Sequence, residues 1–81
     1  QVALLNGRRV ELTAQEMALL LALMNQPDTP VSREQLLREA WGYQSMGETR
    51  TVDVHVQRLR KKLGEDWIET VYKCGYRLRL A

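Results

Sequence analysis

The chain has 81 residues, which is enough for one small folded domain and too few for two separate hydrophobic cores. Apolar residues make up 44% and charged residues 27%, a composition that excludes intrinsic disorder and is typical of a globular domain. The formal net charge is only +2, but Asp53 is the one acid between residues 50 and 60, so positive charge is concentrated in the C-terminal third.

The first predicted element is an N-terminal β-hairpin. Apolar residues precede Asn6-Gly7 within 2–5 and alternate with charged ones within 9–12. Asn-Gly is a strong hairpin signal because both positions tolerate positive φ. A two-stranded hairpin is only marginally stable alone, so we expect it to pack against a later part of the chain.

A helix is predicted next, beginning where Thr13 and Glu16 have the spacing of a capping box. The apolar residues on its expected stripe are Met17, Leu20, Leu21 and Met24. Further apolar residues at 18, 19, 22 and 23 make nearly every face apolar, so this helix should be central to the core. Pro27 and Pro30 then bracket a loop, because proline cannot continue a helical hydrogen-bond ladder.

A second helix is predicted from Ser32-Arg33-Glu34-Gln35, which repeats the capping-box spacing, to Gly42. The apolar residues that share one of its faces are Leu36, Leu37, Ala40 and Trp41. Residues 43–48 lack periodicity and contain Gln, Ser and Gly, so they are expected to form a loop.

A third helix is predicted over about 50–63, ending before Gly64. Its apolar stripe recurs at spacings of four, three and four: Val52, Val56, Leu59 and Leu63. Residues 67–80 are rich in Trp, Ile, Val, Tyr and Leu around Lys73-Cys74-Gly75, which predicts a strand, a basic turn and a strand. The element order indicates an α+β fold with a three-helix core between two hairpins.

The face of the third helix opposite this stripe contains no acid; Asp53 and Arg60 lie on one flank. The residues on the face are Thr51, Val54, His55, Arg58, Lys61 and Lys62. Arg can bridge guanine O6 and N7, polar side chains can bond other base edges, and Val54 can contact a thymine methyl group. The alternative is an ordinary solvated basic face on which Val54 is exposed incidentally.

The sequence RTVDVHVQRLRKKL, residues 50–63, resembles the recognition helix of the OmpR/PhoB family of response-regulator effector domains. Leu12-Thr13 with Glu16 and the following leucines is similar to the family's first helix. Segment 32–42 is similar to its second helix, and Thr70-Val71 with Gly75-Tyr76-Arg77 to its C-terminal hairpin. These segments cover most of the chain in the family's order.

The resemblance implies a winged helix-turn-helix domain over residues 1–81, with the third helix in the major groove of DNA and the hairpin at about 67–80, the wing, on the minor groove or backbone. The residues expected to contact bases are Thr51, Val54, His55 and Arg58. Those expected to contact the DNA backbone, partly from the resemblance and partly from their charge, are Arg50, Arg60, Lys61, Lys62, Lys73 and Arg77.

The same resemblance implies partners. Family members usually bind direct repeats as head-to-tail dimers, which phosphorylation of a receiver domain promotes, and in some of them the loop at 42–49 touches RNA polymerase. The sequence contains no receiver domain, which leaves open an excised effector domain or a natural short version. The predicted function is thus sequence-specific binding of double-stranded DNA for bacterial transcription regulation, as the output of a two-component phosphorelay.

Three positions or segments depart from the family pattern. Tyr72-Lys73 stands where an Arg-Gly pair is common, so Lys73 or Arg77 must replace an arginine often used in the minor groove. Gln57 occupies a position that is often basic. The family usually begins with a four-stranded sheet, whereas this sequence supplies only a short hairpin.

Other function classes find no support in the sequence. A catalytic set, a glycine-rich phosphate loop and a clustered metal-ligand set are all absent, and we expect no enzyme activity, cofactor or metal. Cys74 is the only cysteine, and the longest apolar run, residues 17–24, is far shorter than the roughly 20 residues that cross a bilayer. We expect a cytoplasmic domain without a membrane partner. The competing function is a winged-helix protein-interaction module that binds DNA weakly.

Overall fold

The computed structural model describes residues 2–5, 7–42 and 48–80, in which strands and helices follow the predicted order. The elements are β1 (Val2–Leu5), β2 (Arg8–Glu11), α1 (Ala14–Met24), β3 (Val31–Ser32), α2 (Arg33–Trp41), α3 (Arg50–Leu63), β4 (Ile68–Val71) and β5 (Gly75–Leu78). The α+β class, the N-terminal hairpin, the three-helix core and the C-terminal hairpin are confirmed. None of the described helices is long and apolar enough to cross a membrane.

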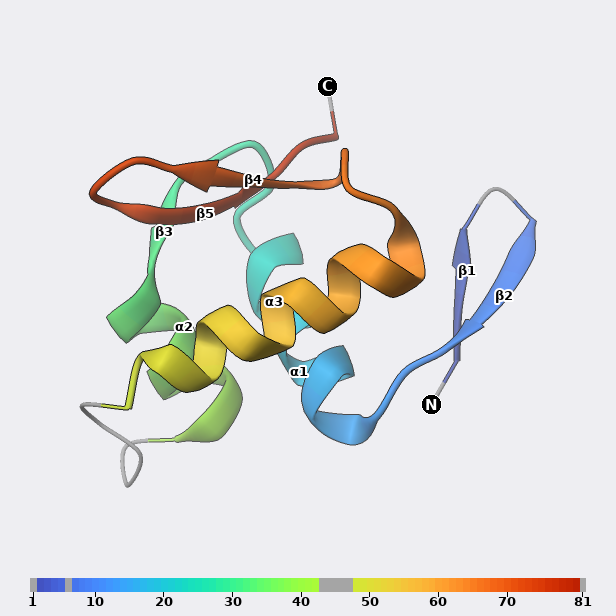
Figure 1. The fold of residues 1–81 in the computed structure, drawn as a ribbon, viewed down its shortest axis with the longest axis horizontal. Helices are drawn as coiled ribbons and strands as arrows, with labels where there is room; N and C mark the ends of the chain where they lie inside the picture. The colour runs from blue at the N-terminus through green and yellow to red at the C-terminus, as the bar shows by residue number, and fades with distance from the viewer. Residues whose placement is uncertain (1, 6, 43–47, 81) are drawn as a thin grey trace.

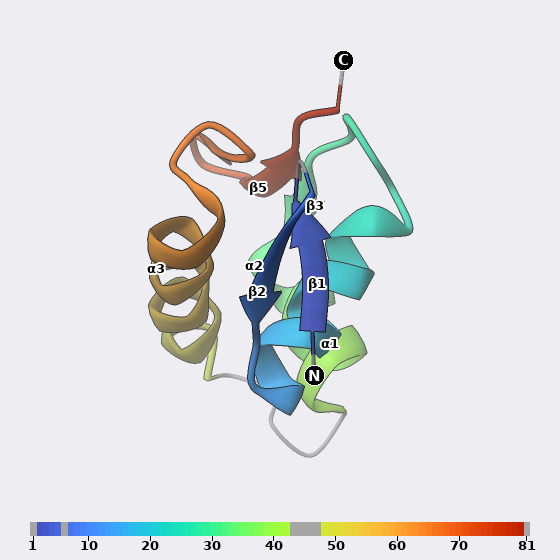
Figure 2. The ribbon, with the colours of Figure 1, turned by 90° about the vertical axis from the view of Figure 1, so that its right-hand side faces the viewer.

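The helices form the centre of the molecule, and the two hairpins lie at its edges. In Figure 1, α3 crosses in front of α1 and α2, while β4 and β5 form the wing above it. The β1–β2 hairpin lies beside the last turn of α3, and Figure 2 shows it in front of the helices with α3 to one side. One outward face of α3 is therefore left uncovered between the two hairpins.

The strand β3 is a feature that the sequence did not predict. It pairs antiparallel with β5 through Val31↔Tyr76 and Ser32↔Gly75, and β5 also pairs with β4, giving the order β3-β5-β4. A two-residue strand has no periodicity from which to recognise it. Gly75 permits the close approach, because a Cβ there would lie 2.0 Å from the carbonyl oxygen of Val31.

The helix α1 begins as predicted but buries a different stripe. Thr13 and Glu16 form both hydrogen bonds of the capping box. The predicted stripe is wrong at Leu21 and Met24, whose exposed fractions are 51% and 50%. The residues that α1 buries are instead Glu16, Leu19, Leu20, Ala22 and Leu23. Because nearly every face of α1 is apolar, the sequence pattern could not show which side of the helix packs against α2, α3 and β5.

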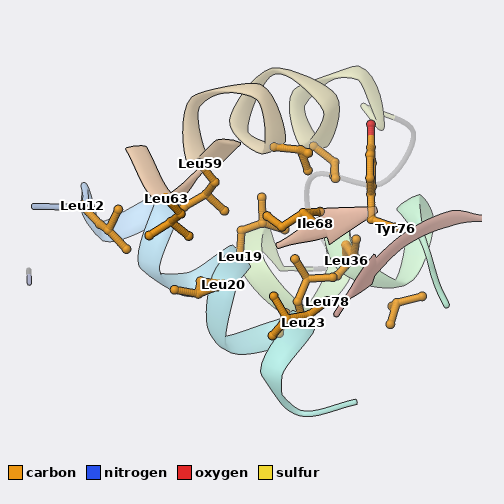
Figure 3. Close-up of a cluster of buried hydrophobic side chains, with 14 of the residues drawn as sticks. Leu12, Leu19, Leu20, Leu23, Leu36, Leu59, Leu63, Ile68, Tyr76 and Leu78 are labelled. Atoms are coloured by element: carbon orange, nitrogen blue, oxygen red, sulfur yellow. The ribbon is translucent and has the colours of Figure 1, made fainter. Parts of the chain in front are cut away.

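The core joins all three helices to the wing. Leu19, Leu23 and Leu36 are fully buried and meet Leu59 from α3 and Ile68 from β4 (Figure 3). All four residues of the predicted α3 stripe are buried. Because one side of α3 is committed to this core, its opposite side is fixed in orientation relative to the rest of the domain.

The N-terminal hairpin packs as expected. Strands β1 and β2 are antiparallel, with Ala3↔Val10 among their Cα partners. Gly7 has a φ of 81°, and Asn6 lies outside the described residues. Val10 and Leu12 are buried in the common core, which explains how a two-stranded hairpin persists on this domain.

Candidate nucleic-acid interface

The outward face of α3 brings together the residues predicted to contact bases. Thr51, Val54, His55 and Arg58 are spaced three or four residues apart on the side opposite the buried stripe. Val54 is 44% exposed and Arg58 is exposed, while Thr51 and His55 are half-buried. The face thus offers an apolar group, a guanidinium, a hydroxyl and an imidazole to a single ligand.

His55 is oriented by two contacts. Its Nδ1 lies 2.9 Å from the backbone carbonyl oxygen of Thr51, one turn earlier. Its ring meets Trp41 of α2 edge-on, with centroids 4.9 Å apart and planes at 77°. Trp41, which was expected on the apolar face of the second helix, is half-buried against the core and also packs on His55.

Arg60, predicted to contact DNA phosphate, is engaged with the wing. Its Nε and Nη2 donate to the carbonyl oxygen of Ile68 at 3.1 and 2.8 Å, and Nη2 also donates to Thr70 Oγ1 at 2.7 Å. The guanidinium carbon lies 5.6 Å from the ring centroid of Tyr76. This side chain therefore links α3 to β4 and β5. Its partner Ile68 in β4 lies eight residues further along the chain.

Asp53, on the same flank of α3, completes the link to the wing. The hydroxyl of Tyr76 donates to Asp53 Oδ1 at 2.6 Å, and Arg33 Nε lies 3.0 Å from the same oxygen. Figure 3 shows the Tyr76 hydroxyl directed toward α3. Burial of the phenol, and then its hydrogen bond to Asp53, raise the pKa of Tyr76. The start of α2, the flank of α3 and the wing thus meet at one carboxylate.

Lys62 is an unexpected partner of a buried acid. Its Nζ lies 2.6 Å from Oε1 of Glu16, a residue that is only 1% exposed. Burial alone would raise the pKa of Glu16, but the bonds from Lys62 and Thr13 outweigh it, so the pKa is lowered. The ammonium that we assigned to DNA phosphate thus already has a carboxylate partner. An acid inside a predicted core helix was the signal for such a pair.

The wing presents a basic turn. Lys73 is exposed with a φ of 60°, and its Nζ lies 5.4 Å from the ring centroid of Tyr72, which is 85% exposed. Cys74 is exposed beside it. Arg77, further along β5, forms an ion pair with Glu69 of β4. Of the two cations expected to replace the family's wing arginine, only Lys73 lacks an acidic partner among the described residues.

Two further cations reach this surface from the N-terminal hairpin. Arg8 and Arg9 are exposed and line a shallow groove with Lys61 and Lys62. Among the described residues that line this groove, the one acid is Glu11. Arg8 Nη2 lies 3.5 Å from the carbonyl oxygen of Lys62. Sequence reasoning missed these arginines because they are about fifty residues from α3 and lie next to an acid.

The remaining predicted positions are placed as follows. Arg50 is exposed at the start of α3, and Lys61 is exposed in its last turn; neither has an acidic partner in the part of the chain that the structure describes. Gln57 is exposed as well. Most of the loop at 42–49, which we linked to RNA polymerase, falls on residues 43–47, outside the described residues.

Comparison with known proteins identifies the family of this chain. The family described as "Transcriptional regulatory protein, C terminal" matches residues 7–78. The transcriptional regulatory protein CseB of Streptomyces coelicolor is 55% identical over 73 residues, which cover 90% of this chain and 31% of CseB. The transcriptional regulatory protein CssR of Bacillus subtilis is 42% identical over 90% of this chain and 32% of its own length.

Solved structures agree with the fold. The DNA-binding domain of Bacillus subtilis CssR superimposes with a TM-score of 0.79 at 42% identity, covering 90% of this chain and 83% of that one. The DNA-binding domain of CpxR from E. coli gives 0.83 at 33% identity, covering 99% and 83%. The chain spans only 31% and 32% of CseB and CssR. It belongs to the family of transcriptional regulatory protein C-terminal domains, the winged-helix effector domains of OmpR/PhoB type, which are not enzymes.

Proposed function

We propose that this domain binds double-stranded DNA sequence-specifically and is the output domain of a bacterial two-component transcription regulator. The helix α3 occupies the major groove, and the β4–β5 wing contacts the minor groove or backbone. The observation that carries this proposal is the outward face of α3, where exposed cations and Val54 stand together without an acid. The relatives, which are named as transcriptional regulators or DNA-binding domains, support it.

The base-contacting set comprises four residues. Arg58 donates to guanine O6 and N7, and Val54 packs on a thymine methyl group. Thr51 and His55 bond other base edges. Their exposure and their shared face on α3 support this division of roles.

The backbone contacts divide into two groups according to what each cation does within the domain. Arg50, Lys61 and Lys73 are exposed without acidic partners among the described residues, so they supply most of the phosphate affinity. Arg60, Lys62 and Arg77 have intramolecular partners and mainly position α3 and the wing. They contribute to phosphate binding through the N–H groups that their intramolecular contacts do not use.

The competing function, a protein-interaction module with weak DNA affinity, is disfavoured by the same face. A solvated or protein-binding helix face usually mixes acids with lysines, because pairs one turn apart stabilise the helix. On α3 the one acid, Asp53, instead contacts Arg33 and Tyr76.

A titration at two salt concentrations separates these functions. Binding to a DNA pool should weaken on the order of 100-fold between about 50 and 200 mM salt, the loss expected for about four phosphate contacts. A protein-interaction module would show little binding at either concentration, and that result would refute the proposal. Selection from a random DNA library then yields the preferred site.

A matched pair of variants tests which side chain reads sequence. Arg58→Ala should cost about 1–3 kcal/mol on the selected site and relax preference at one base pair. Lys61→Ala should weaken binding to all sequences equally and reduce the salt slope by about 1. Unchanged affinity and preference in Arg58→Ala would contradict the assignment.

Three finer aspects rest on the family resemblance alone. The domain binds direct repeats, forms a head-to-tail dimer on them, and contacts RNA polymerase through the loop at 42–49. Sedimentation with duplexes that carry one or two copies of the selected site tests the first two. A dimer that forms only on the duplex with two tandem copies is the expected result.

A further inference from the structure

We propose that His55 recognises an exocyclic amino group in the major groove, N6 of adenine or N4 of cytosine, because the fold places its ring proton on Nδ1. This inference rests on the proposed function and specifies the class of base that one residue of α3 selects. The observation that carries it is the 2.9 Å contact between Nδ1 and the carbonyl oxygen of Thr51.

The Thr51 contact determines the tautomer. A backbone carbonyl oxygen has no hydrogen and can only accept, so Nδ1 must carry the proton and donate it. A neutral imidazole has one ring proton, which leaves Nε2 with a bare lone pair. Neutral His55 therefore presents an acceptor at Nε2.

The accessibility of Nε2 follows from the same geometry. The in-plane bonding directions of Nδ1 and Nε2 diverge widely, so an Nδ1 that bonds the Thr51 carbonyl leaves Nε2 directed away from that oxygen. Among the described residues, the one buried side-chain nitrogen or oxygen without a partner is Arg77 Nε. Within that part of the chain no hydrogen bond to His55 Nε2 is formed, so Nε2 is not a buried atom that lacks a partner.

Trp41 keeps the ring in this orientation. Its indole meets the imidazole edge-on from α2, at a centroid distance of 4.9 Å. Rotation of the imidazole would both break the hydrogen bond to Thr51 and disturb the packing on Trp41. The acceptor is thus held in place before DNA arrives.

The donor and acceptor pattern of the major groove then selects the base. Adenine N6 and cytosine N4 carry hydrogens, whereas guanine offers only the acceptors O6 and N7, and thymine offers O4 and a methyl group. An acceptor can bond the first two bases and faces a lone pair on the others. Val54, His55 and Arg58 therefore present three different chemistries on one face: an apolar surface, an acceptor and a pair of donors.

The tautomer is measured directly on the free domain. At pH 8, above the range in which histidine usually takes up a second proton, long-range proton–nitrogen correlation spectra distinguish a protonated ring nitrogen from a bare one. We expect the proton on Nδ1. A proton on Nε2 would overturn the inference, whatever the result for DNA binding.

Selection from a random DNA library at pH 8 tests the base class. We expect one position where the wild-type domain prefers adenine or cytosine by roughly 2- to 10-fold, the range for one hydrogen bond. His55→Ala should lose that preference and keep the others. In a duplex with adenine at that position, replacing it by purine, which lacks the N6 amino group, should weaken the wild type by the same factor and leave His55→Ala unaffected.

Two variants complete the design. His55→Arg, a donor only, should move the preference at that position to guanine. Gln57→Ala, an exposed neighbour outside the base-contacting set, should leave it unchanged. A wild-type preference for guanine or thymine at the His55-dependent position overturns the inference, and so does an equal loss on all sequences in His55→Ala. Absence of any specific binding by the wild type would instead refute the proposed function.

Discussion

Lys73 occupies a backbone conformation that suits glycine, and it stands where the family commonly has one. Its φ of 60° lies in the left-handed region, which costs a non-glycine residue about 1–2 kcal/mol. The exposed ammonium beside Tyr72 is a cation at the tip of the wing. The chain therefore combines a strained turn with an exposed cation at one residue.

Lys73→Gly should stabilise the domain and weaken DNA binding. Relief of the left-handed strain, less the greater freedom of glycine in the unfolded chain, should raise the free energy of unfolding by about 0.5–1 kcal/mol. Urea denaturation measures this gain. Lys73→Asn, which tolerates the same conformation, should show a smaller gain, and a loss of stability in both variants would contradict the strain argument.

The Glu16–Lys62 pair makes stability depend on pH in the acid range. The folded-state pKa of Glu16 lies below the ordinary value of 4.5, so the unfolded chain binds the proton more readily. The stabilisation is therefore fully present above pH 4.5 and is lost as the pH falls through the lower folded-state pKa. Denaturant titrations between about pH 3 and 7 should show this decline.

Glu16→Gln should flatten that decline and cost about 1–3 kcal/mol at pH 7, because Lys62 loses its negatively charged partner. Lys62→Met should move the decline to higher pH, since Glu16 then stays buried without its cation. The double variant should recover part of the loss. Identical pH profiles for wild type and Glu16→Gln would show that another acid is responsible.

At the scale of the elements, the wing is positioned on α3 through polar contacts of one flank. Arg60 donates to Ile68 and Thr70 of β4, and Asp53 accepts from Tyr76 of β5. The apolar stripe of α3 packs in the core that Ile68 and Leu78 of the wing also join, so this flank and the core together set the helix relative to the hairpin. The two surfaces that we propose to contact one duplex are thereby joined at a defined spacing.

Alanine variants of two neighbouring cations of α3 should differ, one mainly lowering stability and the other mainly lowering DNA affinity. Arg60→Ala should lower the free energy of unfolding by about 1–3 kcal/mol, because it leaves the buried Ile68 carbonyl without its charged donors. Lys61→Ala should change stability by less than about 0.5 kcal/mol while weakening DNA binding. Thermal unfolding and binding assays on both variants check this contrast; equal stabilities would show that the wing does not depend on Arg60.

At the scale of the whole molecule, the fold gathers cations from both ends of the chain. Arg8 and Arg9 of β2 line the same groove as Lys61 of α3, so the basic surface extends from α3 onto the N-terminal hairpin, which Figure 2 shows in front of the helices. The net charge of +2 conceals this asymmetry, because several acids lie elsewhere in the first half of the chain.

The double variant Arg8→Ala/Arg9→Ala should weaken binding to all DNA sequences and reduce the salt slope by about 1–2, if these arginines face phosphates that flank the site. Base preference should stay the same, because neither residue belongs to α3. Arg38→Ala, on α2, is the matched control. An unchanged slope would limit the DNA-binding surface to α3 and the wing.

Local patterns were enough to predict most of the fold and the face that carries the candidate site. The bounds of α3 followed from the spacing of Val52, Val56, Leu59 and Leu63, and the starts of α1 and α2 from capping residues. These signals act within one or two turns of helix and need no information about the rest of the chain. The sequence by itself therefore determined the elements other than β3, and the family resemblance.

Only the tertiary structure decided which cations remain available for a ligand. Arg60, Lys62 and Arg77 looked equivalent to Lys61 and Lys73 as charges along the chain, but they meet partners on β4 or α1. The same holds for β3, whose pairing with β5 comes from a distant strand. An ionic or hydrogen-bonded contact depends on distances of about 3 Å between atoms, and such distances between remote segments exist only after the core has packed.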